Sequence, residues 1–192
     1  MMEQTAAQAS PRLTARIAGV FYLLTILTGG FALFVGGRLV VPGDAAATAT
    51  NILTHEPLLL LGFAADVIST ACYIAVTALF YSLFQPVNRI FALVATLFGV
   101  AGCSIVAAGC LFELIPLVVS GGAQYSRVFT VEPVQALAFI FYKLHARCFN
   151  IGLIFFGFHC LLTACLIFRS KFLAFARLRL RIHETLREIG VN

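Results

Sequence analysis

One uncharged run of about 21 residues, spanning positions 17–37, constrains this chain more than any other feature. A helix of ~20 apolar residues crosses the ~30 Å hydrocarbon core of a bilayer. Three further stretches, 58–84, 90–119 and 148–168, are similarly apolar. Because 61% of the residues are hydrophobic and only 11% are charged, the sequence predicts an all-α integral membrane helical bundle with about four transmembrane helices.

A cleaved signal peptide is the alternative interpretation of residues 17–37. Small residues at 45–47 resemble a cleavage site. The apolar run is longer than the 7–15 residues usual for a signal peptide, which favours a retained span.

The same pattern divides the chain into three parts. We expect a cytoplasmic N-terminal segment at 1–16, a transmembrane helical domain at 17–168 and a basic cytoplasmic tail at 169–192. Asp44 is suited to cap a short Ala/Thr-rich helix at 45–54, which we expect at the membrane interface.

The placement of Lys and Arg indicates the orientation. If both termini are cytoplasmic, nine of the thirteen basic residues lie on the cytoplasmic side. These nine are Arg12, Arg16, Arg89, Arg169, Lys171, Arg177, Arg179, Arg181 and Arg187. We therefore predict a multi-pass protein of the cell inner (plasma) membrane whose basic tail contacts anionic lipid. Nucleic acid is not an expected partner, since the positive charges gather at helix ends and in the tail rather than among aromatic stacking residues.

The six cysteines lie almost wholly inside apolar stretches and form no C-x-x-C pair. This spacing suggests neither a disulfide framework nor a zinc site. We interpret the cysteines as small packing residues and expect no metal and no cofactor.

Small and polar residues recur at helical spacing in three of the predicted spans, which is typical of faces that pack against protein rather than lipid. The series are Tyr22, Thr25, Gly29, Ala32 and Gly36 in the first span, Asp66, Thr70, Tyr73, Thr77 and Tyr81 in the second, and Thr96, Gly99, Cys103, Val106, Cys110 and Glu113 in the third.

Ionisable residues form a candidate polar cluster in the outer half of the predicted bundle. Its members are Asp66, Glu113, Lys143, His145 and Arg147. A charge near the middle of a span costs at least ~2.5–3.5 kcal/mol, so such residues usually have partners. One interpretation is a charge-balanced structural contact between helices. The other is a polar pocket or proton path, with Asp66 as its acid, Arg147 as the counter-charge and His145 exchanging protons. His159 lies deeper and is expected to be a hydrogen-bonded packing residue.

No H-E-x-x-H, G-x-S-x-G or Walker motif occurs in the sequence, so enzymatic readings have little support. We expect a non-enzymatic membrane component or accessory subunit. A small transporter or permeation unit that uses the polar cluster is the first alternative. An intramembrane enzyme with Ser69 or Ser104 as nucleophile is the least favoured.

Several short motifs also resemble a known family. They are R-I-A-G-V-F-Y-L at 16–23, G-D-A-A-A-T at 43–48, P-V-N at 86–88, K-L-H at 143–145 and F-F-G at 155–157. Over residues 15–173 the chain is similar to the bacterial multi-pass membrane family known as domain of unknown function 4386. The resemblance implies a helical inner-membrane protein and brings no activity. It marks Asp44, Asp66 and His145 as positions of interest.

The resemblance ends at the C-terminus. Members of that family continue with a proline and further hydrophobic spans, whereas this chain has Ala174 and then R-L-R-L-R at 177–181. Two interpretations stay open: the tail is an amphipathic basic helix on anionic lipid, or the chain is truncated or frame-shifted at its C-terminus relative to that family. Helix faces left without their former partners would favour a homo-oligomer or association with another membrane protein.

Overall fold

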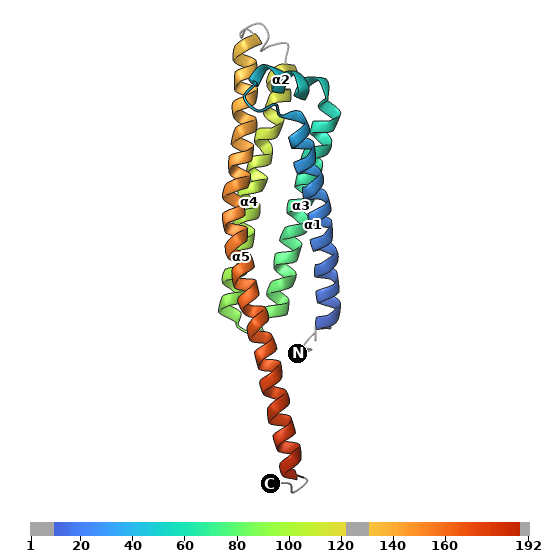
Figure 1. Cartoon of the computed structure of the whole chain (residues 1–192), viewed down its shortest axis with the longest axis vertical. Coiled ribbons are helices and arrows are strands. Elements are labelled where there is room, and N and C mark those ends of the chain that lie inside the picture. The colour runs from blue at the N-terminus through green and yellow to red at the C-terminus, as the bar shows by residue number, and fades with distance from the viewer. Residues whose placement is uncertain (1–9, 122–130, 189–192) are drawn as a thin grey trace, which may run out of the picture.

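The computed structural model describes residues 10–121 and 131–188, without the side chains of residues 119–121, 131, 132, 134 and 172–188. The described residues form helices and no strand. The helices are α1 (Pro11–Leu39), α2 (Ala45–Thr54), α3 (Glu56–Phe84), α4 (Arg89–Gly121) and α5 (Val131–Glu188), as Figure 1 shows. The predicted all-α bundle is therefore confirmed, including the short helix at 45–54.

Local sequence signals explain where the first two helices begin. Ser10 caps α1, its hydroxyl accepting a hydrogen bond from Leu13 N at 3.3 Å, and Pro11 follows at the first helical position. Asp44 caps α2 in the same way, with Oδ1 accepting from Ala47 N at 2.8 Å. Gly43 precedes it with a φ of 82°, a left-handed conformation that favours glycine.

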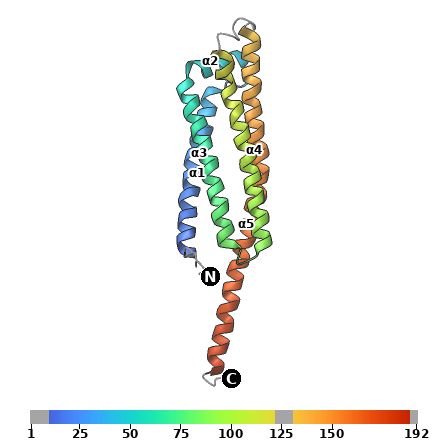
Figure 2. The same cartoon turned by 180° about the vertical axis from the view of Figure 1, so that it is seen from behind.

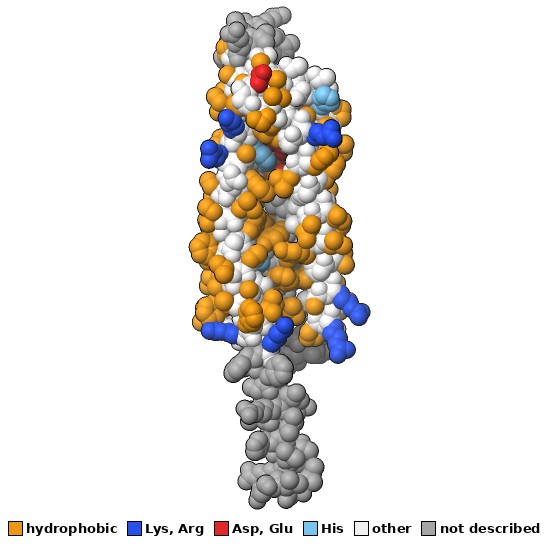
Figure 3. Space-filling model, viewed as in Figure 1, with side chains coloured by type: hydrophobic (Ala, Val, Ile, Leu, Met, Phe, Trp, Pro, Cys, Tyr) orange, Lys and Arg blue, Asp and Glu red, His pale blue; other side chains and the backbone are white. Residues whose placement is uncertain are grey.

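The long helices α1, α3, α4 and α5 are each long and apolar enough to cross a membrane. Their outward faces carry many exposed Leu, Ile, Val and Phe side chains. In Figure 3 these side chains form an apolar band, with Lys and Arg side chains at both ends of the band. Basic residues at the two margins of an apolar band are typical of a bilayer-embedded protein. The chain is thus a multi-pass membrane protein.

Two helix pairs build the bundle. α1 packs along α3, α4 packs along α5, and α3 joins the pairs by packing against α4. Within the described residues the backbones of α1 and α5 stay apart, although the Tyr142 side chain of α5 reaches α1 at Gly36. The gap between the pairs is visible from both sides in Figures 1 and 2. Any residue cluster shared by α3, α4 and α5 therefore lies where the two pairs meet.

α2 lies across one end of the bundle. The start of α1 and the end of α5 lie at the opposite end (Figure 1). Beneath α2 a buried cluster is formed by Val35, Leu39, Ile52, Leu59 and Tyr142. Ile52 is fully buried, so the short helix is fixed to the bundle by its apolar face.

α4 and α5 approach closely at two glycines. A Cβ added to Gly152 would lie 2.6 Å from Val106 Cγ2 and 3.3 Å from the backbone oxygen of Gly102. A Cβ at Gly102 would in turn lie 3.2 Å from Gly152 O. Close backbone approach through small residues is how membrane helices pack without a hydrophobic driving force.

The last part of α5 continues as helix through residues 169–188 and projects beyond the bundle (Figure 1). The predicted contact of the basic tail with anionic lipid depends on side chains outside the described residues, apart from Arg169, Ser170 and Lys171. That contact stays a prediction, as do the predicted domain boundaries.

Candidate functional site

The ionisable residues of the bundle meet where α3, α4 and α5 come together. Asp66 lies on α3, ten residues after Glu56 and therefore about 15 Å along the helix axis. Its Oδ2 lies 3.7 Å from Nε2 of His145 on α5. The two side chains are only 14% and 12% exposed. Figure 3 shows a histidine and an acidic side chain meeting inside the apolar band.

A backbone carbonyl fixes the His145 ring. Nδ1 lies 3.2 Å from the carbonyl oxygen of Gly109 on α4. A carbonyl oxygen only accepts hydrogen bonds, so Nδ1 carries the hydrogen in this contact. In the neutral ring Nε2 then has a lone pair, and this lone pair faces the Asp66 carboxylate. Two acceptors facing each other require a proton or a cation between them.

Cys110 on α4 adds a thiol to the carboxylate of Asp66 and the imidazole of His145. Its thiol is 1% exposed on α4. The ligand atoms of Asp66, Cys110 and His145 all lie within 4.8 Å of one another. Carboxylate, thiolate and imidazole are the groups that bind zinc in proteins.

Glu113 lies one helical turn beyond Cys110 on the same face of α4. It is 4% exposed, and its Oε2 has no hydrogen-bond partner among the described residues. Its Oε1 faces α3, because it lies 3.7 Å from the position of a Cβ on Gly62, one turn before Asp66. A buried, unpartnered carboxyl oxygen is costly and calls for an explanation.

Tyr142 lies one turn before His145 and covers the cluster on the α2 side. Its ring centroid is 6.0 Å from that of His145. Its hydroxyl reaches α1, lying 2.7 Å from the position that a Cβ on Gly36 would take. The glycine therefore makes room for the tyrosine, and both help to close the bundle around the cluster.

Two of the predicted cluster members do not join it. Lys143 and Arg147 are exposed on α5, and the Lys143 ammonium lies 4.4 Å from the ring centroid of Phe139. Residues two apart on a helix point in nearly opposite directions, since each residue turns by about 100°. The rotation of α5 that turns His145 toward the bundle interior therefore turns Lys143 and Arg147 toward its surface. Asp66 faces His145 rather than the expected counter-charge, Arg147.

The sequence interpretation missed Cys110 as a site residue. The signal was present, because Cys110 and Glu113 belong to one helical series of small and polar residues. Absence of a C-x-x-C pair argued against a metal site. The three potential ligands come instead from three different helices, a combination that spacing along the chain does not reveal.

The other polar residues singled out in the sequence have backbone carbonyl oxygens as hydrogen-bond partners. His159 is 2% exposed, and its Nδ1 lies 2.8 Å from Ala95 O, which confirms the expected hydrogen-bonded packing role. Ser69 Oγ donates to Thr25 O, joining α3 to α1, and Ser104 Oγ donates to Val100 O in its own helix. Neither serine has a histidine as a described hydrogen-bond partner.

Comparison with known families gives one match. The model of the family described as "Domain of unknown function (DUF4386)" matches residues 17–176. No curated protein and no solved structure matches the chain.

Proposed function

The chain belongs to the DUF4386 family, and on that premise we propose that it is a non-enzymatic membrane component that binds a divalent transition-metal ion of the zinc class. The ligands are Asp66, Cys110 and His145. One observation carries the proposal: an imidazole nitrogen, a thiol and a carboxylate from three helices lie within 4.8 Å of one another inside the bundle.

The spacing of these atoms suits a metal after small side-chain adjustments. Ligands at 2.0–2.3 Å from a tetrahedral ion are separated from one another by about 3.5 Å. Asp66 Oδ2 and His145 Nε2 are already 3.7 Å apart. The separations from the Cys110 sulfur are at most 4.8 Å. A side-chain rotation that moves this sulfur by about 1 Å would bring them close to the spacing of ligands on a tetrahedral ion.

The surrounding groups favour a metal ligand role for His145. Metal-binding histidines commonly donate their second ring N–H to a carbonyl or carboxylate, which fixes the ring and leaves the other nitrogen free. The contact from Nδ1 to Gly109 O has this form. Glu113 lies outside the group of ligand atoms within 4.8 Å of one another, but its unpartnered Oε2, one turn from Cys110, makes it the candidate fourth ligand after a side-chain rotation. A divalent cation would also offset the cost of holding acidic groups inside a membrane.

Cobalt binding tests this function. The purified full-length protein, titrated with Co²⁺, is expected to bind one ion and to give a thiolate-to-cobalt absorption band. C110S should remove the band because the sulfur ligand is gone. C103S is the matched control, since Cys103 is equally buried on α4 and lies about two turns away from Cys110. Absence of the band in the natural protein, or equal loss in both variants, would contradict metal binding at this cluster.

The orientation is part of the same proposal. We place α2 outside and both termini in the cytoplasm of a bacterial inner membrane, supported by the excess of Lys and Arg at the end opposite α2. In a cysteine-free protein, a cysteine introduced at exposed Thr50 should react with an impermeant maleimide in intact cells. A cysteine at exposed Gln85 should react only after permeabilisation. The reverse pattern would invert the topology.

A further inference from the structure

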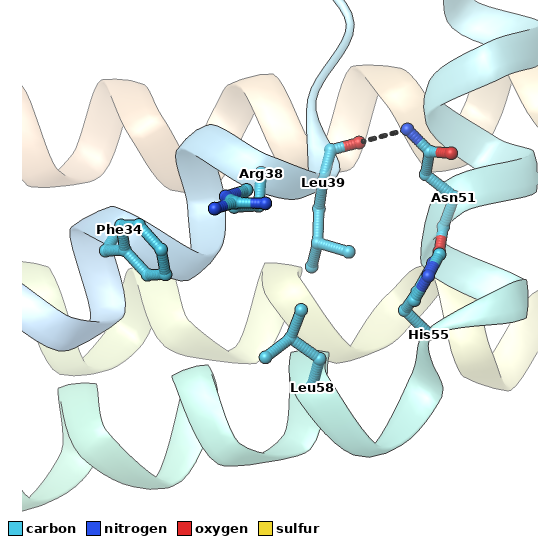
Figure 4. Close-up of a pocket in the computed structure, with 6 residues that line it drawn as sticks. All are labelled: Phe34, Arg38, Leu39, Asn51, His55 and Leu58. Atoms are coloured by element: carbon cyan, nitrogen blue, oxygen red, sulfur yellow. Dashed lines mark hydrogen bonds between the residues drawn. The ribbon is translucent and has the colours of Figure 1, made fainter.

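A mainly apolar hollow with a few polar side chains lies at the α2 end of the bundle, apart from the candidate metal cluster. It has a volume of about 510 Å³ and is lined by Phe34, Arg38, Leu39, Asn51, His55 and Leu58. Figure 4 shows that α1, α2 and the beginning of α3 contribute these side chains. Its position between three segments makes it a shaped pocket rather than a flat surface.

The pocket has an apolar floor and a polar rim. Leu39 is 1% exposed and Leu58 is half-buried, and in Figure 4 they lie between Arg38 on one side and His55 on the other. Phe34 lies beside Arg38, whose guanidinium carbon is 5.1 Å from the ring centroid. The hollow therefore offers both hydrogen-bonding groups and apolar contact area.

Arg38 brings an unneutralised positive charge to this pocket. No carboxylate of the described residues lies within 4.0 Å of its guanidinium. Stacking on Phe34 restricts the side chain without using its N–H groups. An arginine guanidinium presents a planar fork of N–H donors that matches the oxygens of a phosphate.

The opposite wall holds donors in fixed positions. Asn51 Nδ2 donates to Leu39 O at 3.4 Å, which orients the amide and leaves its second N–H free of that contact. His55 Nδ1 lies 3.0 Å from Asn51 O, which orients the imidazole toward the pocket.

The level of the pocket along the bundle suggests the source of a phosphate. Arg38 lies in the last turn of α1, where the apolar band ends and basic side chains begin. Arg and Lys at this margin lie at the depth of lipid headgroups. Phe34, one turn before Arg38, lies on the side of the apolar band, whereas Leu39 and Leu58 lie between Arg38 and His55.

We propose that this pocket binds the headgroup of an anionic phospholipid, with the phosphate on Arg38 and the Asn51 amide. The adjoining glycerol and first chain carbons lie on Phe34, Leu39 and Leu58. This combination of a phosphate site and an apolar floor fits an amphipathic lipid better than a soluble anion. The site is independent of the metal ion proposed above.

Lipid titration followed by native mass spectrometry tests the assignment. Delipidated full-length protein is expected to bind one phosphatidylglycerol in preference to phosphatidylcholine. R38Q should weaken phosphatidylglycerol binding at least roughly fivefold, since one basic residue near an anionic headgroup contributes about 1 kcal/mol. Arg38 is exposed, so the variant should fold normally.

R147Q is the matched control, because Arg147 is also an exposed arginine but lies on α5 outside the pocket. Its phosphatidylglycerol affinity should equal that of the natural protein. Equal weakening in R38Q and R147Q would mean that basic residues act only as a diffuse charge and would overturn the proposal. Displacement of the lipid by an equal concentration of inorganic phosphate would also overturn it, since the pocket would then be a soluble-anion site. Equal affinities for phosphatidylglycerol and phosphatidylcholine would overturn it too, because phosphatidylcholine carries no net charge.

Discussion

Replacing Gly152 by leucine is expected to lower the free energy of unfolding by about 3 kcal/mol, the upper range for overpacking a well-packed interface. A Cβ at this position already lies 2.6 Å from Val106 Cγ2 and 3.3 Å from the Gly102 backbone oxygen. The valine methyl can rotate away, but the backbone of α4 cannot move without separating the two helices. The larger leucine must therefore push α4 from α5. Unfolding of the purified protein in mixed micelles, followed by circular dichroism, measures the change.

G157L is the matched control. Gly157 lies on the same helix, and a Cβ there meets no heavy atom within 4 Å among the described residues. Gly157 is exposed on the surface of the bundle. Leucine is also a better helix former than glycine, so this variant should be neutral or slightly stabilised. Similar losses in G152L and G157L would mean that helix α5 tolerates no large residue anywhere, and the close contact with α4 would not be the cause.

Replacing Glu113 by methionine is expected to raise the stability of the metal-free protein and to reduce the stabilisation that zinc provides. In the metal-free protein the change removes a buried carboxyl oxygen that has no described partner. Methionine fills a similar volume with an unbranched apolar chain, so metal-free stability should rise by about 1–2 kcal/mol. The variant lacks the proposed fourth ligand, so Zn²⁺ should stabilise it much less than it stabilises the natural protein.

The natural protein supplies the comparison for that second arm. An ion that binds only the folded state stabilises it by about 2.7 kcal/mol when its concentration is 100 times the dissociation constant. Denaturant unfolding with Zn²⁺ and with a chelator should therefore show a large difference for the natural protein and a small one for E113M.

T96V is a suitable control for E113M. Thr96 is a half-buried residue of α4 whose hydroxyl donates to Ala92 O, far from the cluster. T96V should be slightly less stable than the natural protein and should keep the full response to Zn²⁺. If E113M instead destabilises the metal-free protein, and zinc has no effect on the natural chain, the carboxylate is a structural contact between helices and the metal proposal fails.

The position of the cluster gives metal binding a structural consequence. Asp66 belongs to the α1–α3 pair, whereas Cys110, Glu113 and His145 belong to the α4–α5 pair. The backbones of α1 and α5 stay apart in the described residues, so the two pairs meet mainly through α3 and α4. An ion bound by ligands from both pairs would join them. Loss of the ion would leave the acidic groups close together and favour separation of the pairs, which is one way for a membrane component to respond to metal.

Much of the fold followed from the sequence alone, because bilayer thickness and backbone hydrogen bonding leave few choices. Apolar runs of about 20 residues or more predict spanning helices, and Asp44 before an Ala/Thr-rich segment is a helix-capping signal. The small-residue series on the third span also marked its packing face correctly, since Cys103, Val106 and Cys110 are all buried. These features depend on neighbours within one helix.

The composition of the site was decided by tertiary structure. From the chain order it was clear that Asp66, Glu113 and the residues near 145 reach the same half of the bundle. Which of them meet depends on the rotation of each helix about its own axis. That rotation is set by contacts such as Gly102 against Gly152, which join residues 50 positions apart. On α5 it turns His145 inward and both Lys143 and Arg147 outward.

The sequence by itself thus determined that this chain is a bundle of membrane helices and how those helices follow one another. Only the tertiary structure decided that Asp66 faces His145, that Cys110 lies within 4.8 Å of both and that Arg38 borders a pocket with Asn51. The physical reason is the range of the interactions. Hydropathy and capping act within a few turns of one helix, whereas a binding site is defined by side chains that different helices bring together.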